Sequence, residues 1–158
     1  MRLAALTGAR AALRLLAYAW AAPYSLLGLT VGLLALLLGA RARLREGAME
    51  FGGGWLGVRL SRLPAPFCFS AITVGHVILG IDEATLAAAR AHEHVHVRQY
   101  ERWGPLFVPA YLLSSLAQLV RGRRPYLDNR FEREAYSVAG CGPGAAQGRS
   151  LPKPGEQR

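Results

Sequence analysis

The sequence predicts an α+β fold in which an N-terminal transmembrane helix precedes a small antiparallel sheet and three further helices. Three observations predict it: an uncharged run over residues 15–40, short β-branched runs with turn residues over 47–81, and helical patterns from residue 82 onward. The 158 residues fit one domain with a membrane appendage, and 52% of them are hydrophobic. We expect a membrane anchor over residues 1–45, a folded domain over 46–139, and a disordered tail over 140–158.

The N-terminal run from Leu15 to Ala40 is long enough to span a bilayer core, which needs about 20 apolar residues in a helix. A cleaved signal segment is the alternative, because Ala40-Arg41-Ala42 has the A-x-A pattern of a cleavage site. The flanking arginines are nearly balanced and orient the helix only weakly. Of the 19 basic side chains, 16 follow Ala40, which favours a cytoplasmic position for the domain, with a periplasmic or secreted position as the alternative.

Residues 47–81 are rich in glycine and contain two β-branched runs, at 71–74 and 76–79. These features predict two or three short strands in a small sheet. Pro64, Pro66 and the glycines argue against a second spanning helix in this segment.

Three helices are predicted after the sheet. Asp82 is a candidate N-cap for a helix that continues to Arg102 or Trp103, where Gly104-Pro105 ends it. A second, uncharged helix covers residues 106–120, and a basic break follows at 121–125. A third, shorter helix begins near Asp128 or Asn129. From residue 140 the composition is that of a disordered tail.

The first of these helices carries a candidate metal site. His92 and His96 are four residues apart, so both side chains leave the same face of the helix, whereas His94 points away to packing or solvent. Glu93 completes an HExxH sequence. Two neutral imidazoles one turn apart can bind Zn²⁺, and the adjacent carboxylate can take a proton from metal-bound water.

Beyond the pentapeptide, His92-Glu93-x-x-His96 followed by Glu132-x-x-Ala135 resembles gluzincin-type metallopeptidases, and more narrowly small membrane-associated bacterial HExxH proteins. The resemblance covers roughly residues 74–136. It implies a minimal zincin-like domain with Glu132 as the third zinc ligand and Glu93 as general base, acting on a peptide or protein. It also implies that the stretch 74–78 is an edge strand that holds an extended peptide. Tyr136 stands where the family usually has Asp.

The roles of four polar residues stay open at this point. Glu132 lies three residues after Asn129, the spacing of a capping box, so it can be a ligand or a cap, with Glu134 as the fallback ligand. Gln99 can support the site, face the substrate or lie on the surface. His76 can polarise a substrate carbonyl or be structural.

The zinc interpretation restricts the path of the chain. The uncharged stretch 103–120 is borderline for a spanning helix, and crossing would put Glu132 on the wrong side of the membrane from His96. We therefore expect this helix to pack on the active-site helix or to lie in the membrane interface. The arginines at 121, 123 and 124 would then meet lipid phosphates.

The function predicted first is a membrane-associated zinc metallopeptidase, a hydrolase that uses metal-activated water and whose partners are a peptide substrate and membrane lipid. The alternative is a non-catalytic membrane scaffold that retains the HExxH fold. Nucleic-acid binding is not expected. The net charge of +9 would allow it, but the arginines are scattered and do not alternate with aromatic residues. The sequence determines neither substrate specificity nor oligomeric state.

Overall fold

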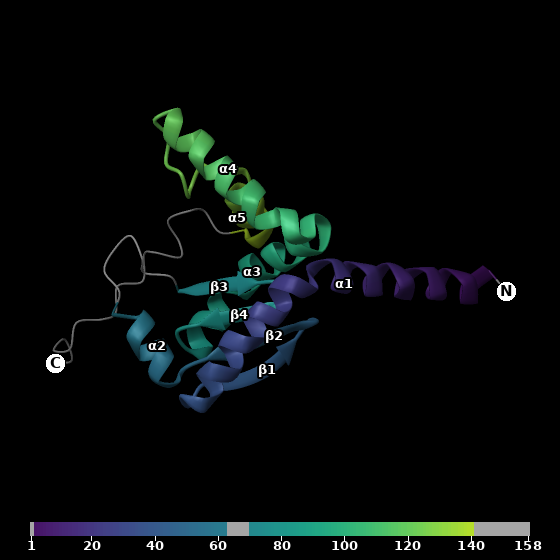
Figure 1. Cartoon of the computed structure of the whole chain (residues 1–158), viewed down its shortest axis with the longest axis horizontal. Coiled ribbons are helices and arrows are strands. Elements are labelled where there is room, and N and C mark those ends of the chain that lie inside the picture. Colours follow the sequence, from purple (N-terminus) through teal and green to yellow (C-terminus); the bar gives the residue numbers. More distant parts are fainter. Residues whose placement is uncertain (1, 63–69, 141–158) are drawn as a thin grey trace.

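The structure is a computed structural model that describes residues 2–62 and 70–140, and it confirms the α+β class (Figure 1). The described elements are, in chain order, α1 (Arg2–Leu37), β1 (Arg41–Arg45), β2 (Ala48–Gly52), α2 (Gly54–Leu60), β3 (Ala71–Val74), β4 (Val77–Gly80), α3 (Glu83–Trp103), the 3-10 turn η1 (Gly104–Leu106), α4 (Phe107–Val120) and α5 (Arg130–Ala139). The expected tail from 141 to 158 lies outside the described residues.

The sheet has the order β1-β2-β4-β3 and is mixed, so the prediction of an antiparallel sheet was wrong. Two antiparallel hairpins, β1–β2 and β3–β4, join through a parallel pair formed by β2 and β4. The chain between the hairpins passes through α2, and this crossover allows β4 to lie parallel to β2. The turn at Gly75 and His76 also divides the expected edge strand at 74–78. The edge strand of the sheet on this side is β3.

Helix α1 covers one face of the sheet at close range. The side chains of Phe51, Val77 and Leu79 form the core on this face, with Leu29 of α1 packed against it. The approach depends on small residues, because a Cβ atom on Gly32 would lie 2.4 Å from the Phe51 ring. A Cβ atom on Gly28 would lie 2.7 Å from the Cβ atom of Val77. Without these two glycines the helix could not lie on the sheet.

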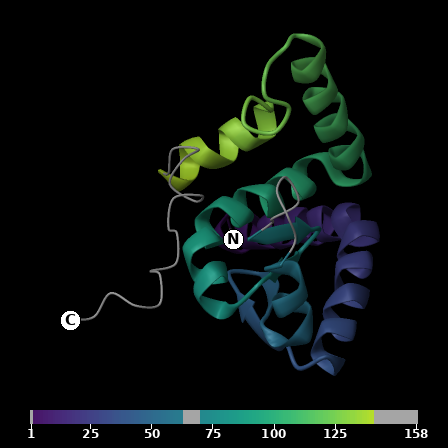
Figure 2. The same ribbon diagram turned by 90° about the vertical axis from the view of Figure 1, so that its left-hand side faces the viewer.

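Helix α3 covers the opposite face, so the sheet lies between α1 and α3 (Figure 2). Leu86 and Val97 of α3 pack on Ala48 and Ile78 in a second core cluster. Beside this cluster an ion pair joins the first half of α3 to β2, in which the half-buried Arg90 guanidinium approaches the buried Glu50 carboxylate to 2.7 Å. The helix that carries the HExxH sequence is thus held by the sheet along its length.

Residues on both sides of the predicted boundary at residue 45 belong to this one layered structure. Strand β1 pairs with β2 along its whole length, and α1 contributes to the core. Cleavage at Ala40-Arg41-Ala42 would remove the helix that covers Phe51. By length and composition, the stretches Ala11–Leu37 and Glu83–Val120 are each long and apolar enough to cross a membrane.

We expect Gly32→Val to destabilise the fold, because the added methyl groups would collide with the Phe51 ring. Overpacking of this kind costs about 1–3 kcal/mol. The free energy of unfolding, measured with urea on the purified protein, should fall by that amount. The matched control is Leu33→Val, at an exposed position on the same helix, which should change it little. Equal stability of the two variants would contradict the packing described.

Candidate metal centre

The two histidines of the HExxH sequence converge at the surface of α3. The helix begins at the N-cap Asp82, whose carboxylate accepts a hydrogen bond from the backbone N–H of Thr85 at 2.7 Å, and it ends at Gly104. Both ends agree with the sequence prediction. The Nε2 atoms of His92 and His96 lie 3.1 Å apart, so both side chains turn the same ring nitrogen toward one point.

Glu132 of α5 completes the group. Its Oε2 lies 3.2 Å from His92 Nε2, and its Oε1 lies 3.4 Å from His96 Nε2. One ligand atom from each of the three side chains lies within 4.8 Å of the others. The structure therefore brings together the three predicted ligands, on elements that are far apart in the sequence.

The capping alternative for Glu132 is not what the structure shows. Asn129 caps α5 with its own side chain, which accepts from the backbone N–H of Phe131 at 2.9 Å. In a capping box the glutamate would accept the Asn129 backbone N–H. That N–H donates instead to the carbonyl of Tyr126. The Glu132 carboxylate is thus available to the histidines.

Helix α4 and the return of the chain through α5 bring Glu132 back to α3. The Asn129 amide donates to the carbonyl of Tyr111 at 3.0 Å and to the Ser115 hydroxyl at 2.7 Å, which ties the start of α5 to the middle of α4. The Tyr111 hydroxyl donates to Glu132 Oε1 at 2.7 Å. Glu132 therefore lies next to His96, as the zinc interpretation requires.

The group fits a divalent cation. Two ligands of a tetrahedral zinc, each about 2.0–2.1 Å from the metal, lie roughly 3.3 Å apart, close to the spacings described above. The Oε2 atom of Glu132 is buried and makes no hydrogen bond within the described residues, although it faces His92. Burial acts to raise the pKa of Glu132, but the close approach of His92 and His96 outweighs it and lowers the pKa to about 2. The carboxylate is therefore ionised and suited to a cation.

Gln99 supports His96 from behind. Its side chain is fully buried, and its NH₂ group donates to the Phe131 carbonyl at 3.1 Å and to Glu134 at 3.0 Å. Both partners are acceptors, so the amide oxygen faces His96 Nδ1 at 2.8 Å and accepts a hydrogen bond from its N–H. This leaves Nε2 unprotonated and free to bind a metal. Glu134, the fallback ligand, instead bonds Gln99 and Arg102.

Glu93 is held beside the histidines by the edge strand. Its side chain is buried, and Oε2 accepts a hydrogen bond from the Thr73 hydroxyl at 2.7 Å. Thr73 lies on β3 and also donates to the Glu93 carbonyl at 3.3 Å. Sequence reasoning missed Thr73 and Tyr111, because no motif marks either residue and only the fold brings them to the site.

Three further residues discussed in the sequence analysis are His94, His76 and Tyr136. His94 is buried, in agreement with a packing position. His76 lies between Ser25 and Glu101, 3.0 and 3.2 Å from its two ring nitrogens, and stacks on Tyr18, so its contacts are those of a structural residue. Tyr136 packs its ring on His92, with ring centroids 4.6 Å apart.

No protein family model, curated protein sequence or solved structure matches this chain.

We expect the purified protein to bind about one zinc per chain, and Glu132→Ala to lose most of it, because the variant keeps only two ligands. Metal content by atomic emission after dialysis measures this. Glu134→Ala is the control, since that carboxylate faces Gln99 and Arg102, and it should retain zinc. Zinc retained by Glu132→Ala but lost by Glu134→Ala would reassign the third ligand.

We also expect Gln99→Met to weaken zinc binding by about 10–100-fold, since His96 loses the acceptor that orients its ring. Competition with a fluorescent chelator gives the affinity. The substitution also leaves the Phe131 carbonyl and Glu134 without the Gln99 amide as a hydrogen-bond donor. Circular dichroism of the same sample shows whether the helices persist. The control is Arg98→Met, at the exposed residue before Gln99, and this variant should bind zinc as the wild type does.

Proposed function

We propose that this chain is a membrane-associated zinc-dependent metallopeptidase of gluzincin type. The observation that carries the proposal is the convergence of His92, His96 and Glu132 beside the buried carboxylate of Glu93. Three protein ligands of this kind leave one coordination position open, which is typical of catalytic rather than structural zinc sites.

The residues of the chain would divide the work of peptide hydrolysis as follows. When bound, zinc supplies Lewis acidity and lowers the pKa of its water ligand to about 7. Glu93 would act as general base toward the attacking water, whose oxygen would bond to the scissile carbonyl carbon, and would pass the proton to the amine released when the C–N bond breaks. The Thr73 hydroxyl positions the Glu93 carboxylate through its 2.7 Å hydrogen bond. Gln99 and Tyr111 hold His96 and Glu132 in place.

The position of β3 supports a peptide as the substrate. Thr73 lies in the middle of this strand, and β3 is the last strand on its side of the sheet. Within the described residues, no strand pairs with its outer edge. An extended peptide that added to this edge would pass close to Glu93.

A non-catalytic scaffold is the second candidate, and Tyr136 favours it. Where the family usually has a supporting carboxylate, this chain places an aromatic ring against His92. Such a ring can fill space around a metal that only stabilises the fold.

We expect Glu93→Gln to abolish peptide hydrolysis while zinc binding persists, because the amide cannot accept the proton of water. Loss of a general base reduces turnover by about 10²–10⁴-fold. Cleavage of an unstructured protein such as casein, followed by mass spectrometry beside zinc content, measures both properties. Glu83→Gln, in the first turn of α3, is the matched control and should remain active. Unchanged hydrolysis in Glu93→Gln would contradict the proposed mechanism.

The same proposal places the enzyme at a membrane with α1 as its anchor. The apolar residues of α1 and of α4 support this. The arginine count favours the cytoplasmic face.

A further inference from the structure

Two helices present large apolar side chains to the outside of the molecule. The exposed leucines of α1 include Leu26, Leu33 and Leu37, which follow at spacings of seven and four residues and so form one stripe. On α4 the exposed residues include Leu112, Leu116 and Leu119. Both helices lie on the side that faces the viewer in Figure 1, and both lie along the right-hand edge in Figure 2. We call this side the α1–α4 face.

We propose that the α1–α4 face docks onto an anionic lipid bilayer with both helices lying in the plane of the membrane, so that neither helix crosses it. This inference deepens the membrane part of the proposed function and does not depend on the zinc site. In this proposal the protein attaches to the membrane through the exposed apolar surface of two helices and not through a spanning helix.

Strand β1 shows why α1 cannot cross the bilayer in this fold. The strand follows the C-terminal end of α1, and the turn after it returns to the level of Tyr18, whose hydroxyl donates to the carbonyl of Gly47 at 3.0 Å. Residues 41–47 thus run back along the helical segment 18–37. That segment has 20 residues and is about 30 Å long, the thickness of the hydrocarbon core.

If the segment 18–37 crossed the bilayer, β1 would lie at hydrocarbon depth. This strand is fully exposed, carries Arg41, Arg43 and Arg45, and forms an edge of the sheet. Exposed arginines and an open strand edge are both strongly unfavourable in hydrocarbon. Residues 2–17 of α1 are unsuited to the hydrocarbon core, because they contain Arg2, Arg10 and Arg14.

The alternation of β1 agrees with docking in the plane. Its three arginines pair in register with Gly52, Glu50 and Ala48, on the side of the sheet covered by α3. Leu44 pairs with Met49, which packs on the α1 side, and Leu44 is itself exposed. The strand therefore turns its charges away from the α1–α4 face and an apolar side chain toward it.

The same restriction applies to α4. Helix α5 runs back beside it, held by the Asn129 and Tyr111 hydrogen bonds described above, and carries the exposed Arg130 and Arg133. If α4 crossed, α5 would have to enter the hydrocarbon with these charges. Lying in the interface, α4 buries its leucines while α5 stays in water.

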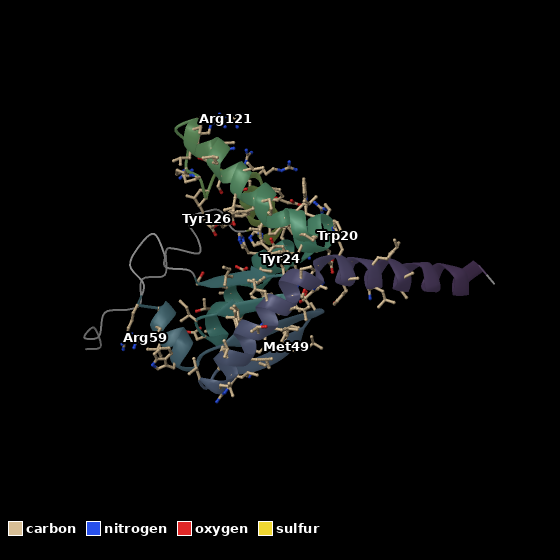
Figure 3. All side chains as sticks on the ribbon, in the orientation of Figure 1. Trp20, Tyr24, Met49, Arg59, Arg121 and Tyr126 are labelled. Atoms are coloured by element: carbon tan, nitrogen blue, oxygen red, sulfur yellow. The ribbon has the colours of Figure 1, made fainter. Side chains whose placement is uncertain are left out.

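An anionic lipid surface matches the charge and aromatic residues around this face. The net charge is +9, and Arg121 lies exposed at the far end of α4, where Figure 3 shows it. Arg123 follows it in the same exposed turn, and within the described residues neither forms an ion pair. Trp20, labelled in the same view where α1 meets η1, is 48% exposed and typical of a membrane interface. Arginines of this kind bind lipid phosphates.

Membrane depth along α1 tests the proposal directly. Single cysteines at Leu26, Leu33, Leu37, Leu112 and Leu119 are introduced after Cys68 and Cys141 have been replaced by serine. Each is labelled with a fluorophore, and quenching by lipids brominated at different depths is measured in phosphatidylcholine–phosphatidylglycerol vesicles. We expect all five labels at a similar shallow depth, about 5–10 Å below the headgroups. A crossing helix would instead separate Leu26 from Leu37 by about 16 Å, and that gradient would overturn the proposal.

Vesicle flotation tests the surface and its charge. The double variant Leu112→Gln/Leu119→Gln should bind roughly tenfold or more weakly, since two leucines no longer leave water. The control Val138→Gln, at an exposed residue of α5, should bind within twofold of the wild type. Binding should also fall when phosphatidylglycerol is omitted or salt is raised. Equal vesicle binding by the two variants would overturn the proposal and indicate that another surface binds the lipid. A dimer that forms in place of vesicle binding would also overturn it and indicate that a second copy covers the α1–α4 face. Zinc content of the same samples reports on the metal site separately.

Discussion

The position of α3 between the sheet and α5 is the constraint on which the rest of the structure depends. Its inner face packs on Ala48 and Ile78, and its outer face presents His92 and His96 to Glu132. A helix held on one side by a sheet keeps its two histidines in a constant relation. The connection from α4 to α5 then brings the third residue of the group, Glu132, back to α3.

The supporting contacts of the metal centre come from both sides of α3. Thr73 reaches Glu93 from the sheet, while Gln99 joins His96 to the backbone of α5. The site is therefore coupled to the packing of both elements, and a change in either would move a functional side chain. The buried Gln99 side chain joins three partners at once: His96, the Phe131 carbonyl and Glu134.

The layered fold also limits how the protein can meet a membrane. A helix packed along a sheet shares its depth with that sheet, so a crossing α1 would bring the exposed arginines of β1 to hydrocarbon depth together with its own apolar stripe. Docking by the α1–α4 face would place the leucines of α1 in the membrane interface and leave the arginines of β1 in water. It would also hold the metal centre, which is tied to α4 through Tyr111, at a constant distance from the lipid surface.

The sequence by itself determined the helices and the ligand types, since capping at Asp82, the stop at Gly104 and the spacing of His92 and His96 are local signals. It also indicated Glu132, through the short pattern that ends at Ala135. Only the tertiary structure decided the parallel pairing of β2 with β4, the divided strand at Gly75, and the contacts of Thr73 and Tyr111. It likewise showed that Glu132 faces His92 and His96 and does not cap α5. These features depend on which distant segments lie together, and no local pattern of residue types specifies that.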